Sequence, residues 1–175
     1  MKREDIPAII ELSFVLIVTS AMYIYGLGKY IQFDNQALVT KGVSELTGME
    51  LMWVFYGYSK SYAVVLGILE VVGGTLLLIR KTRILGGLLL TGILMNVIVQ
   101  DIFYEVNVGA LKAAIIYQIM ILGILWLNRT TLLQGIKAML LQSKSTLKRK
   151  RKLVIICCAI LLAILLKVIE FQITH

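Results

Sequence analysis

The chain has 175 residues, of which 59% are hydrophobic and 16% charged, and its mean hydropathy is +0.87. Soluble domains contain about 45–50% apolar and about 25% charged residues, so this composition excludes a water-soluble globular domain. The formal net charge is +8, but the basic residues lie in short segments between long apolar runs, which indicates membrane topology rather than a nucleic-acid partner.

Residues 8–31 form the first long apolar run. A helix needs about 20 apolar residues to cross about 30 Å of hydrocarbon, so this run predicts a membrane-spanning helix. A secretory signal peptide is the competing interpretation. It is disfavoured because the run is too long, no small-x-small cleavage site follows it, and residues 1–5 are balanced in charge.

The connection over residues 32–60 is longer than most connections between helices. Near its end lies an aromatic cluster, composed of Trp53, Phe55, Tyr56 and Tyr58. Two interpretations stay open. The cluster forms an aromatic belt at the lipid headgroups, which is the more common case, or it forms a lid over a pocket.

Three further apolar runs cover residues 61–79, 84–104 and 108–128. Each is long enough to cross a bilayer as a helix. Together with residues 8–31 they predict an all-α, integral membrane helical bundle with a four-helix core over residues 1–128.

A cytoplasmic linker is predicted over residues 129–152. Its first part is expected to be an amphipathic helix in the membrane interface, because apolar residues recur at helical spacing, namely Leu132, Leu133, Ile136, Met139 and Leu140. The basic run at residues 148–152 is expected to bind anionic lipid.

A fifth transmembrane helix is predicted over residues 153–175, with its apolar run at 153–171. The uninterrupted apolar stretch stops at Leu166, short of the about 20 residues that a full crossing requires. It spans the bilayer only if Lys167 and Glu170 extend their charged ends to the far interface.

The distribution of Lys and Arg predicts the orientation. Most of the 18 basic residues lie on the side that includes Lys2, Arg3, the turn at residues 80–83 and the run at 148–152. Because cytoplasmic loops carry the excess of positive charge, the N-terminus is expected in the cytoplasm of a multi-pass protein of a bacterial cytoplasmic (inner) membrane.

Polar residues of four helices fall near the predicted centre of the bilayer at about 1.5 Å of rise per residue. They are Thr19, Ser20, Glu70, Asn96 and Gln118. A carboxylate at this depth costs at least about 2.5–3.5 kcal/mol, so Glu70 is expected to face the bundle interior and to be hydrogen-bonded by the amides and hydroxyls. The pattern predicts a mid-membrane polar pocket around Glu70.

Interhelical packing is the alternative explanation for these residues. Amides commonly bridge helices, and Gly67, Gly73 and Gly74 would allow close approach. This explanation is favoured for Asn96 and Gln118 taken singly. A functional role is favoured for Glu70, because a glutamine would link helices equally well without the cost of ionisation.

A second polar cluster is predicted near the outer interface, formed by Gln100, Asp101, Glu105 and Lys112. Asp101 and Glu105 share a helix face, and Lys112 can return across the short turn to pair with one of them. The pattern is more typical of a structural clasp than of a site.

The cysteines and the histidine mostly exclude functions. Cys157 and Cys158 are adjacent on a helix, so they cannot form the CxxC pair of thiol exchange. His175 is the only histidine, which removes the usual haem, zinc and copper ligand sets. No metal site and no covalently bound or metal-ligated cofactor is therefore expected.

Several stretches resemble the DoxX-like family of small bacterial membrane proteins: YGLGKY (25–30), MWVFYGYSKSY (52–62), GILEVVGGTLLLIRKTRILGG (67–87), MNVIVQDIFYEV (95–106) and GALKAAIIYQ (109–118). The resemblance covers roughly residues 8–128, and its best marker is Glu70 with Gly73 and Gly74, followed by the basic turn. It implies a four-helix core. Members have been linked to quinone-coupled sulfur oxidation, to thiol and superoxide stress complexes and, in distant animal relatives, to chaperoning of membrane receptors.

Two functions follow as expectations. The first is an accessory subunit of a quinone- or thiol-linked membrane redox assembly, in which Glu70 and the aromatic lid hold a quinone-like lipid. The second is a non-enzymatic scaffold, assembly factor or chaperone. The lack of ligand sets for a redox centre weighs against an autonomous enzyme, and a proton-coupled carrier is disfavoured because the chain shows no internal repeat. The expected partners are the lipid bilayer, with anionic lipid at the linker, and a membrane or redox protein.

Overall fold

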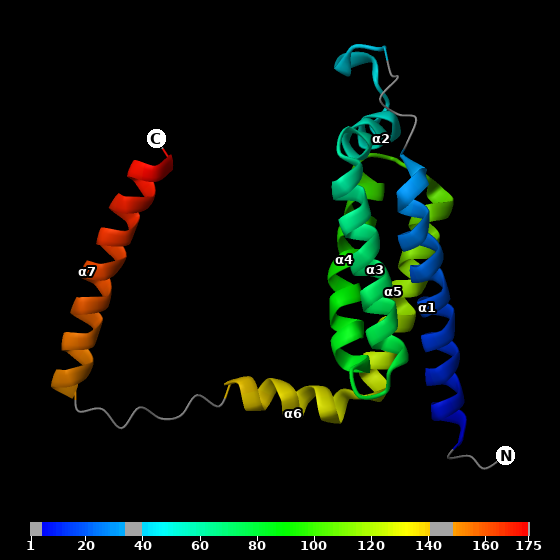
Figure 1. Cartoon of the computed structure of the whole chain (residues 1–175). Coiled ribbons are helices and arrows are strands. Elements are labelled where there is room, and N and C mark those ends of the chain that lie inside the picture. The colour runs from blue at the N-terminus through cyan, green and yellow to red at the C-terminus, as the bar shows by residue number, and fades with distance from the viewer. Residues whose placement is uncertain (1–4, 34–39, 141–148, 175) are drawn as a thin grey trace. The chain divides into compact units, whose positions relative to one another are not determined.

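The computed structural model describes residues 5–33, 40–140 and 149–174, and within them every element is helical (Figure 1). The elements are, in order, α1 (Asp5–Gln32), the short 3-10 helix η2 (Val43–Glu45), α2 (Gly48–Tyr58), α3 (Lys60–Leu78), α4 (Arg83–Phe103), α5 (Val108–Leu127), α6 (Arg129–Leu140) and α7 (Arg149–Thr174). The chain divides into two compact units, Met1–Ile136 and Lys137–His175.

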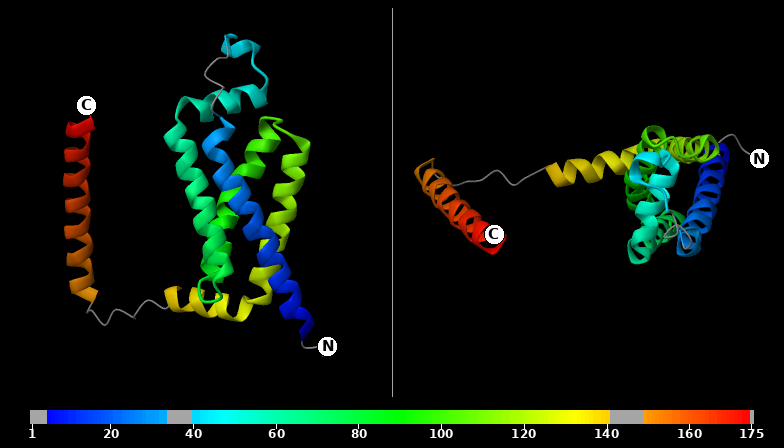
Figure 2. Two further views of the ribbon diagram at one scale, coloured as in Figure 1. Left: turned by 45° about the vertical axis from the view of Figure 1, so that its right-hand side comes forward. Right: turned by 90° about the horizontal axis from the view of Figure 1, so that it is seen from above.

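Four helices form the bundle of the first unit. Around it, α1 packs on α3, α3 on α4, α4 on α5, and α5 back on α1 (Figures 1 and 2). All four are long and apolar enough to cross a membrane, which confirms the four predicted spans to within a few residues. Their shared core contains the fully buried side chains Val15, Val18, Met22, Leu77, Leu90, Ile121 and Ile124.

Helices α1 and α3 approach each other closely where they cross at Gly26 and Gly67. A Cβ atom on Gly26 would lie 2.6 Å from the Gly67 carbonyl oxygen, and a Cβ on Gly67 would overlap with the Gly26 carbonyl. Neither position has room for a side chain, so the backbones touch here. The prediction that Gly67 permits close approach is confirmed, with Gly26 as its partner.

Helix α2 lies across the end of the bundle where α1 ends and α3 begins (Figures 1 and 2). A capping box starts it: the Thr47 hydroxyl accepts a hydrogen bond from the Glu50 N–H, and Glu50 accepts one from the Thr47 N–H at 2.8 Å. At Gly48 the helix packs directly against the backbone of Tyr104. The aromatic cluster expected in a loop is therefore part of a helix.

A polar clasp closes the opposite end of the bundle. The Arg83 guanidinium (Nη1) lies 2.7 Å from Glu11 Oε1, and Asn128 Nδ2 donates to the same oxygen at 2.9 Å. Both charged side chains are largely buried. The clasp ties α1 to the start of α4 and to the end of α5.

Helix α6 follows α5 directly, and of its apolar residues only Leu132 packs on the bundle core. The other four predicted interface residues, Leu133, Ile136, Met139 and Leu140, are exposed. Residues 141–148, which include Lys148 of the predicted basic run, lie outside the described residues, as do Lys2, Arg3 and His175.

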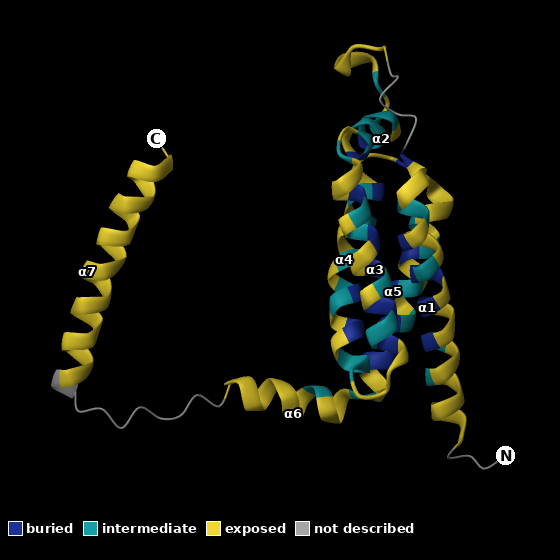
Figure 3. Cartoon of the chain, viewed as in Figure 1, coloured by how far each residue is buried: buried dark blue, intermediate teal, exposed yellow. Residues whose placement is uncertain are grey.

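Helix α7 is also long and apolar enough to span a membrane. Within it, every residue from 151 to 174 is exposed (Figure 3), including Cys157 and Cys158. Near its end the Lys167 ammonium pairs with the Glu170 carboxylate at 2.7 Å. The five long apolar helices are the number that the sequence predicts for a multi-pass membrane protein.

Candidate functional site: a cavity beneath α2

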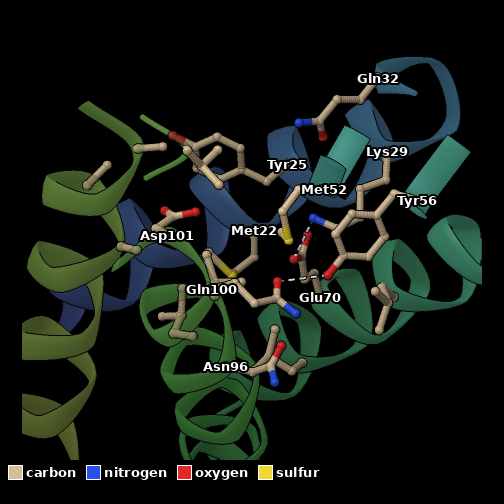
Figure 4. A pocket seen from close by; sticks show the side chains of 18 of the residues that line it. Met22, Tyr25, Lys29, Gln32, Met52, Tyr56, Glu70, Asn96, Gln100 and Asp101 are labelled. Atoms are coloured by element: carbon tan, nitrogen blue, oxygen red, sulfur yellow. Dashed lines mark hydrogen bonds and ion pairs between the residues drawn. The ribbon is translucent and has the colours of Figure 1, made fainter. Parts of the chain in front are cut away.

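A cavity of about 480 Å³ lies inside the bundle beneath α2 (Figure 4). Helices α1, α2, α3, α4 and α5 all contribute side chains to its lining. The lining is mostly apolar, and its polar members are Tyr25, Lys29, Gln32, Tyr56, Tyr62, Glu70, Asn96, Gln100, Asp101 and Tyr117, besides the indole of Trp53.

Lys29 and Glu70 form an ion pair in this cavity, with 2.9 Å between Lys29 Nζ and Glu70 Oε1. Their side chains are 15% and 5% exposed. Each residue lies three positions beyond a glycine of the α1–α3 crossing, Gly26 or Gly67. The helices are antiparallel, and each Cα–Cβ bond tilts towards its own helix N-terminus, so the two side chains lean towards each other across the contact.

Asp101 supplies a second carboxylate. Its side chain is buried, with 8% of the residue exposed, and Lys29 is close enough to interact electrostatically with both Asp101 and Glu70. The charge of one ammonium therefore acts on two carboxylates, and of the two only Glu70 is within ion-pair distance of Lys29. Among the described residues, the buried oxygens Glu70 Oε2 and Asp101 Oδ2 have no hydrogen-bond partner.

Tyr56 joins the roof of the cavity to its wall. Its hydroxyl donates a hydrogen bond to Gln100 Oε1 at 2.8 Å, linking α2 to α4. Burial raises the pKa of Tyr56, so the hydroxyl stays protonated and remains a donor at neutral pH. Phe33 and Tyr62 stack on the Tyr56 ring at 5.0 and 6.0 Å between centroids, which gives the cavity an aromatic roof.

Of the four residues predicted as a lid, Trp53 and Tyr56 line the cavity. Phe55 and Tyr58 do not, and they are 58% and 92% exposed. The reason is helical geometry: α2 presents Met52, Trp53 and Tyr56 on its inner face, and the intervening residues point away. The lid is therefore smaller than predicted.

The five residues predicted to share one polar layer do not all meet. Glu70 and Asn96 line the cavity, but Ser20 is exposed, and Thr19 Oγ1 instead donates to the Gly74 carbonyl at 3.2 Å. Gln118 is buried away from the cavity lining and donates to Thr91 Oγ1 at 3.4 Å. Residues at the same depth in the membrane can point in different directions around their helices. The five predicted residues therefore do not share one pocket.

The prediction that amides and hydroxyls satisfy Glu70 is wrong, because its partner is Lys29. The prediction of a structural clasp near the outer interface is also wrong. Gln100 and Asp101 belong to the cavity, whereas Glu105 occupies a left-handed turn position (φ 49°), and Lys112 is exposed and forms no ion pair with any described acid. Asn107 closes this turn instead, by accepting hydrogen bonds from the N–H groups of Gly109 and Ala110.

Over 151 residues the protein is 29% identical to the uncharacterized protein YwoB of Bacillus subtilis (strain 168), and the alignment covers 84% of this chain and 92% of that protein. No protein-family model matches the chain, and no solved structure matches it.

Sequence reasoning missed several lining residues, chiefly Lys29, Tyr25, Gln32 and Tyr62. Lys29 was counted with the basic residues that flank the membrane, whereas its long side chain reaches inward to Glu70. A signal existed in the pair Gly26–Lys29 on α1 and Gly67–Glu70 on α3, since equal spacing from two helix-contact glycines brings opposite charges together.

The chemistry available in the cavity is that of hydrogen bonding and proton exchange. Two carboxylates, one ammonium and several hydroxyl and amide groups lie within an apolar, aromatic-roofed space. In the described parts of the chain, no group of three His, Cys, Asp or Glu side chains is arranged to hold a metal ion. Such a site suits an apolar ring that carries polar groups at its edge.

Proposed function

We propose that the protein is an accessory subunit of a quinone- or thiol-linked redox assembly in a bacterial cytoplasmic membrane, and that it binds a quinone-like lipid in the cavity beneath α2. The observation that carries the proposal is the coincidence in one cavity of an aromatic roof, at Trp53 and Tyr56, with buried carboxylates, at Glu70 and Asp101. Carboxylates buried at membrane depth are costly, and such groups usually mark a pathway or a site.

The dimensions support a ring-shaped head group. Pockets for small molecules commonly measure about 300–1,000 Å³, and they combine apolar walls with a few convergent polar groups. The cavity, at about 480 Å³, is within that range. The stacked rings of Phe33, Tyr56 and Tyr62 offer flat surfaces to a planar ligand.

The orientation is part of the proposal. With the N-terminus in the cytoplasm, the clasp of Glu11 and Arg83 lies at the inner side, and α2 roofs the cavity from the outer side. The basic segment after α6 then lies at the cytoplasmic surface, where anionic lipid attracts it.

The proposal is tested by identifying the lipids that the purified protein retains. After gentle detergent extraction, we expect mass spectrometry to find a prenylated quinone in the wild type and in Glu105→Gln, which removes a charge outside the cavity lining. Glu70→Gln should lose the lipid while remaining folded, because it keeps the shape of the side chain but removes its charge. Retention of the lipid by Glu70→Gln would show that Glu70 does not hold it.

A scaffold or assembly factor is the second candidate. The observations that favour it are the links from Thr19 to the Gly74 carbonyl and from Gln118 to Thr91, since these deep polar groups join helices without facing the cavity. If Glu70 is only another such link, Glu70→Gln should keep full activity in any phenotype that deletion of the gene removes. That result would favour the scaffold over the redox subunit.

A further inference from the structure

The cavity contains an imbalance of hydrogen-bonding groups. Among the described side chains that line it, two buried oxygens lack a partner, Glu70 Oε2 and Asp101 Oδ2. Both belong to residues more than nine-tenths buried, which are 4% and 8% exposed. Figure 4 shows the two carboxylates among the side chains of the cavity.

The nearby donors do not remove this imbalance. The Lys29 ammonium bonds the other oxygen of Glu70, and the Tyr56 hydroxyl bonds Gln100. Among the described residues, no donor lies within hydrogen-bond distance of Glu70 Oε2 or Asp101 Oδ2. An ionised carboxylate only accepts hydrogen bonds, and a buried acceptor without a donor is unfavourable. The cavity therefore favours a ligand that brings its own donors.

We propose that the cavity selects the reduced, hydroquinone form of its ligand over the oxidised quinone. The inference rests on the proposed function and specifies its ligand. Hydroquinone hydroxyls donate hydrogen bonds to the two free carboxylate oxygens, whereas quinone carbonyls only accept hydrogen bonds and would place a partially negative oxygen against a carboxylate oxygen. The aromatic roof stacks on either ring, so the discrimination comes from Glu70 and Asp101.

An ammonium head group would also supply donors. Lys29 opposes it, because its own ammonium lines the cavity and interacts with both carboxylates. A second cation would meet this charge in a site of low dielectric, where repulsion is strong. A neutral hydroxyl group avoids that repulsion.

Calorimetry on the protein in lipid nanodiscs provides the test. The probes are a decyl-substituted benzohydroquinone kept reduced without oxygen, the corresponding quinone, the hydroquinone dimethyl ether and decylammonium. We expect the hydroquinone to bind roughly tenfold or more tightly than the other three, as a hydrogen bond to a charged group allows. The ether is the matched probe, because it keeps the reduced ring but cannot donate.

Asp101→Asn should bring the hydroquinone and quinone affinities to within about threefold of each other, because the amide offers a donor as well as an acceptor. Glu105→Gln, at the same end of α4 but outside the lining, should keep the wild-type ratio. If Asp101→Asn does not fold, the comparison of hydroquinone with its ether in the wild type still decides.

The outcomes separate this inference from the proposed function. Equal binding of hydroquinone, quinone and ether by the wild type overturns the selectivity and leaves a quinone-like lipid site. Tightest binding of decylammonium assigns the cavity to amines and overturns the hydroquinone. Failure of every probe to bind overturns the proposed function itself.

Discussion

At the scale of single residues, the central feature is the sharing of one ammonium by two carboxylates. Lys29 contacts Glu70 at 2.9 Å and interacts electrostatically with Asp101. Removing one member of a buried ion pair costs more than the pair contributes, because the remaining charge is left without compensation. The three residues should therefore differ in how strongly each supports the fold.

Lys29→Met should destabilise the protein by about 3–5 kcal/mol, because it leaves the buried Glu70 carboxylate without its ion-pair partner and removes a positive charge that also acts on Asp101. Glu70→Gln should cost less, since Asp101 still balances Lys29. The measurement is the apparent melting temperature in detergent. The double variant Lys29→Met with Glu70→Gln should recover part of the loss of stability seen in Lys29→Met alone. Equal losses in the two single variants would contradict the shared ammonium.

At the scale of elements, the α1–α3 crossing positions the ion pair. Helix contact at Gly26 and Gly67 requires the absence of both side chains, and the close approach of small residues is a common way to pack membrane helices. The sequence predicts Gly67 as such a contact from composition alone. It cannot predict the partner glycine, because rotation of each helix about its axis depends on packing that no single helix encodes.

Gly26→Ala should destabilise the bundle by about 1–3 kcal/mol, because its methyl group would lie 2.6 Å from a carbonyl of α3 and force the helices apart. Gly28→Ala on the same helix is the control. Apart from its own stretch of α1, no described part of the chain lies within 4 Å of its Cβ position, so this change should leave the melting temperature unchanged or raise it slightly. Similar effects of both changes would mean that helix propensity, not contact, governs α1.

The start of α2 responds to pH through Glu50. The Lys41 ammonium, followed by the N–H and hydroxyl of Thr47, lowers the pKa of Glu50 from 4.5 to about 2. A carboxylate whose pKa is lower in the folded state than in the unfolded state stabilises the fold fully at pH values above its unfolded-state pKa. The contribution of Glu50 is thus complete above about pH 4.5 and is lost as the pH falls towards 2.

In a Trp126→Phe background, Trp53 is the only tryptophan and reports on α2. Its emission should move to longer wavelength between pH 4.5 and 2, as protonation of Glu50 loosens the start of the helix over the cavity. Glu50→Gln should show much of that change already at neutral pH. Glu45→Gln, which removes a nearby acid outside the capping box, is the control. A flat profile in the wild type would contradict this role of Glu50.

At the scale of the whole molecule, hydropathy predicted the elements better than the contacts between them. The apolar run at 61–79 corresponds to α3, Lys60–Leu78. The agreement is close because the bilayer requires long apolar helices however they pack. Helix α2 was missed, although Thr47 and Glu50 carry the spacing of a capping box. Depth along each helix correctly predicted Glu70 and Asn96 as cavity residues. It wrongly predicted Thr19, Ser20 and Gln118, because the direction in which each side chain points depends on tertiary packing.

Helix α7 has a shorter uninterrupted apolar stretch, ending at Leu166, than a full crossing requires. The helix has 26 residues, about 39 Å at 1.5 Å per residue, which exceeds the about 30 Å of hydrocarbon. Its charged residues near the end, Lys167 and Glu170, pair with each other at 2.7 Å. Pairing lowers the cost of placing them near the interface, so α7 should span.

In a background without Cys157 and Cys158, a cysteine introduced as Ile173→Cys should therefore react with an impermeant maleimide added to intact cells. Ser44→Cys in η2 should react likewise, and Gly135→Cys in α6 should react only after lysis, because an N-terminus in the cytoplasm places α6 inside. Reaction of Ile173→Cys only after lysis would show that α7 stays on the cytoplasmic side. The bundle of α1, α3, α4 and α5 would then be the whole membrane-spanning part, since its core is complete without α7.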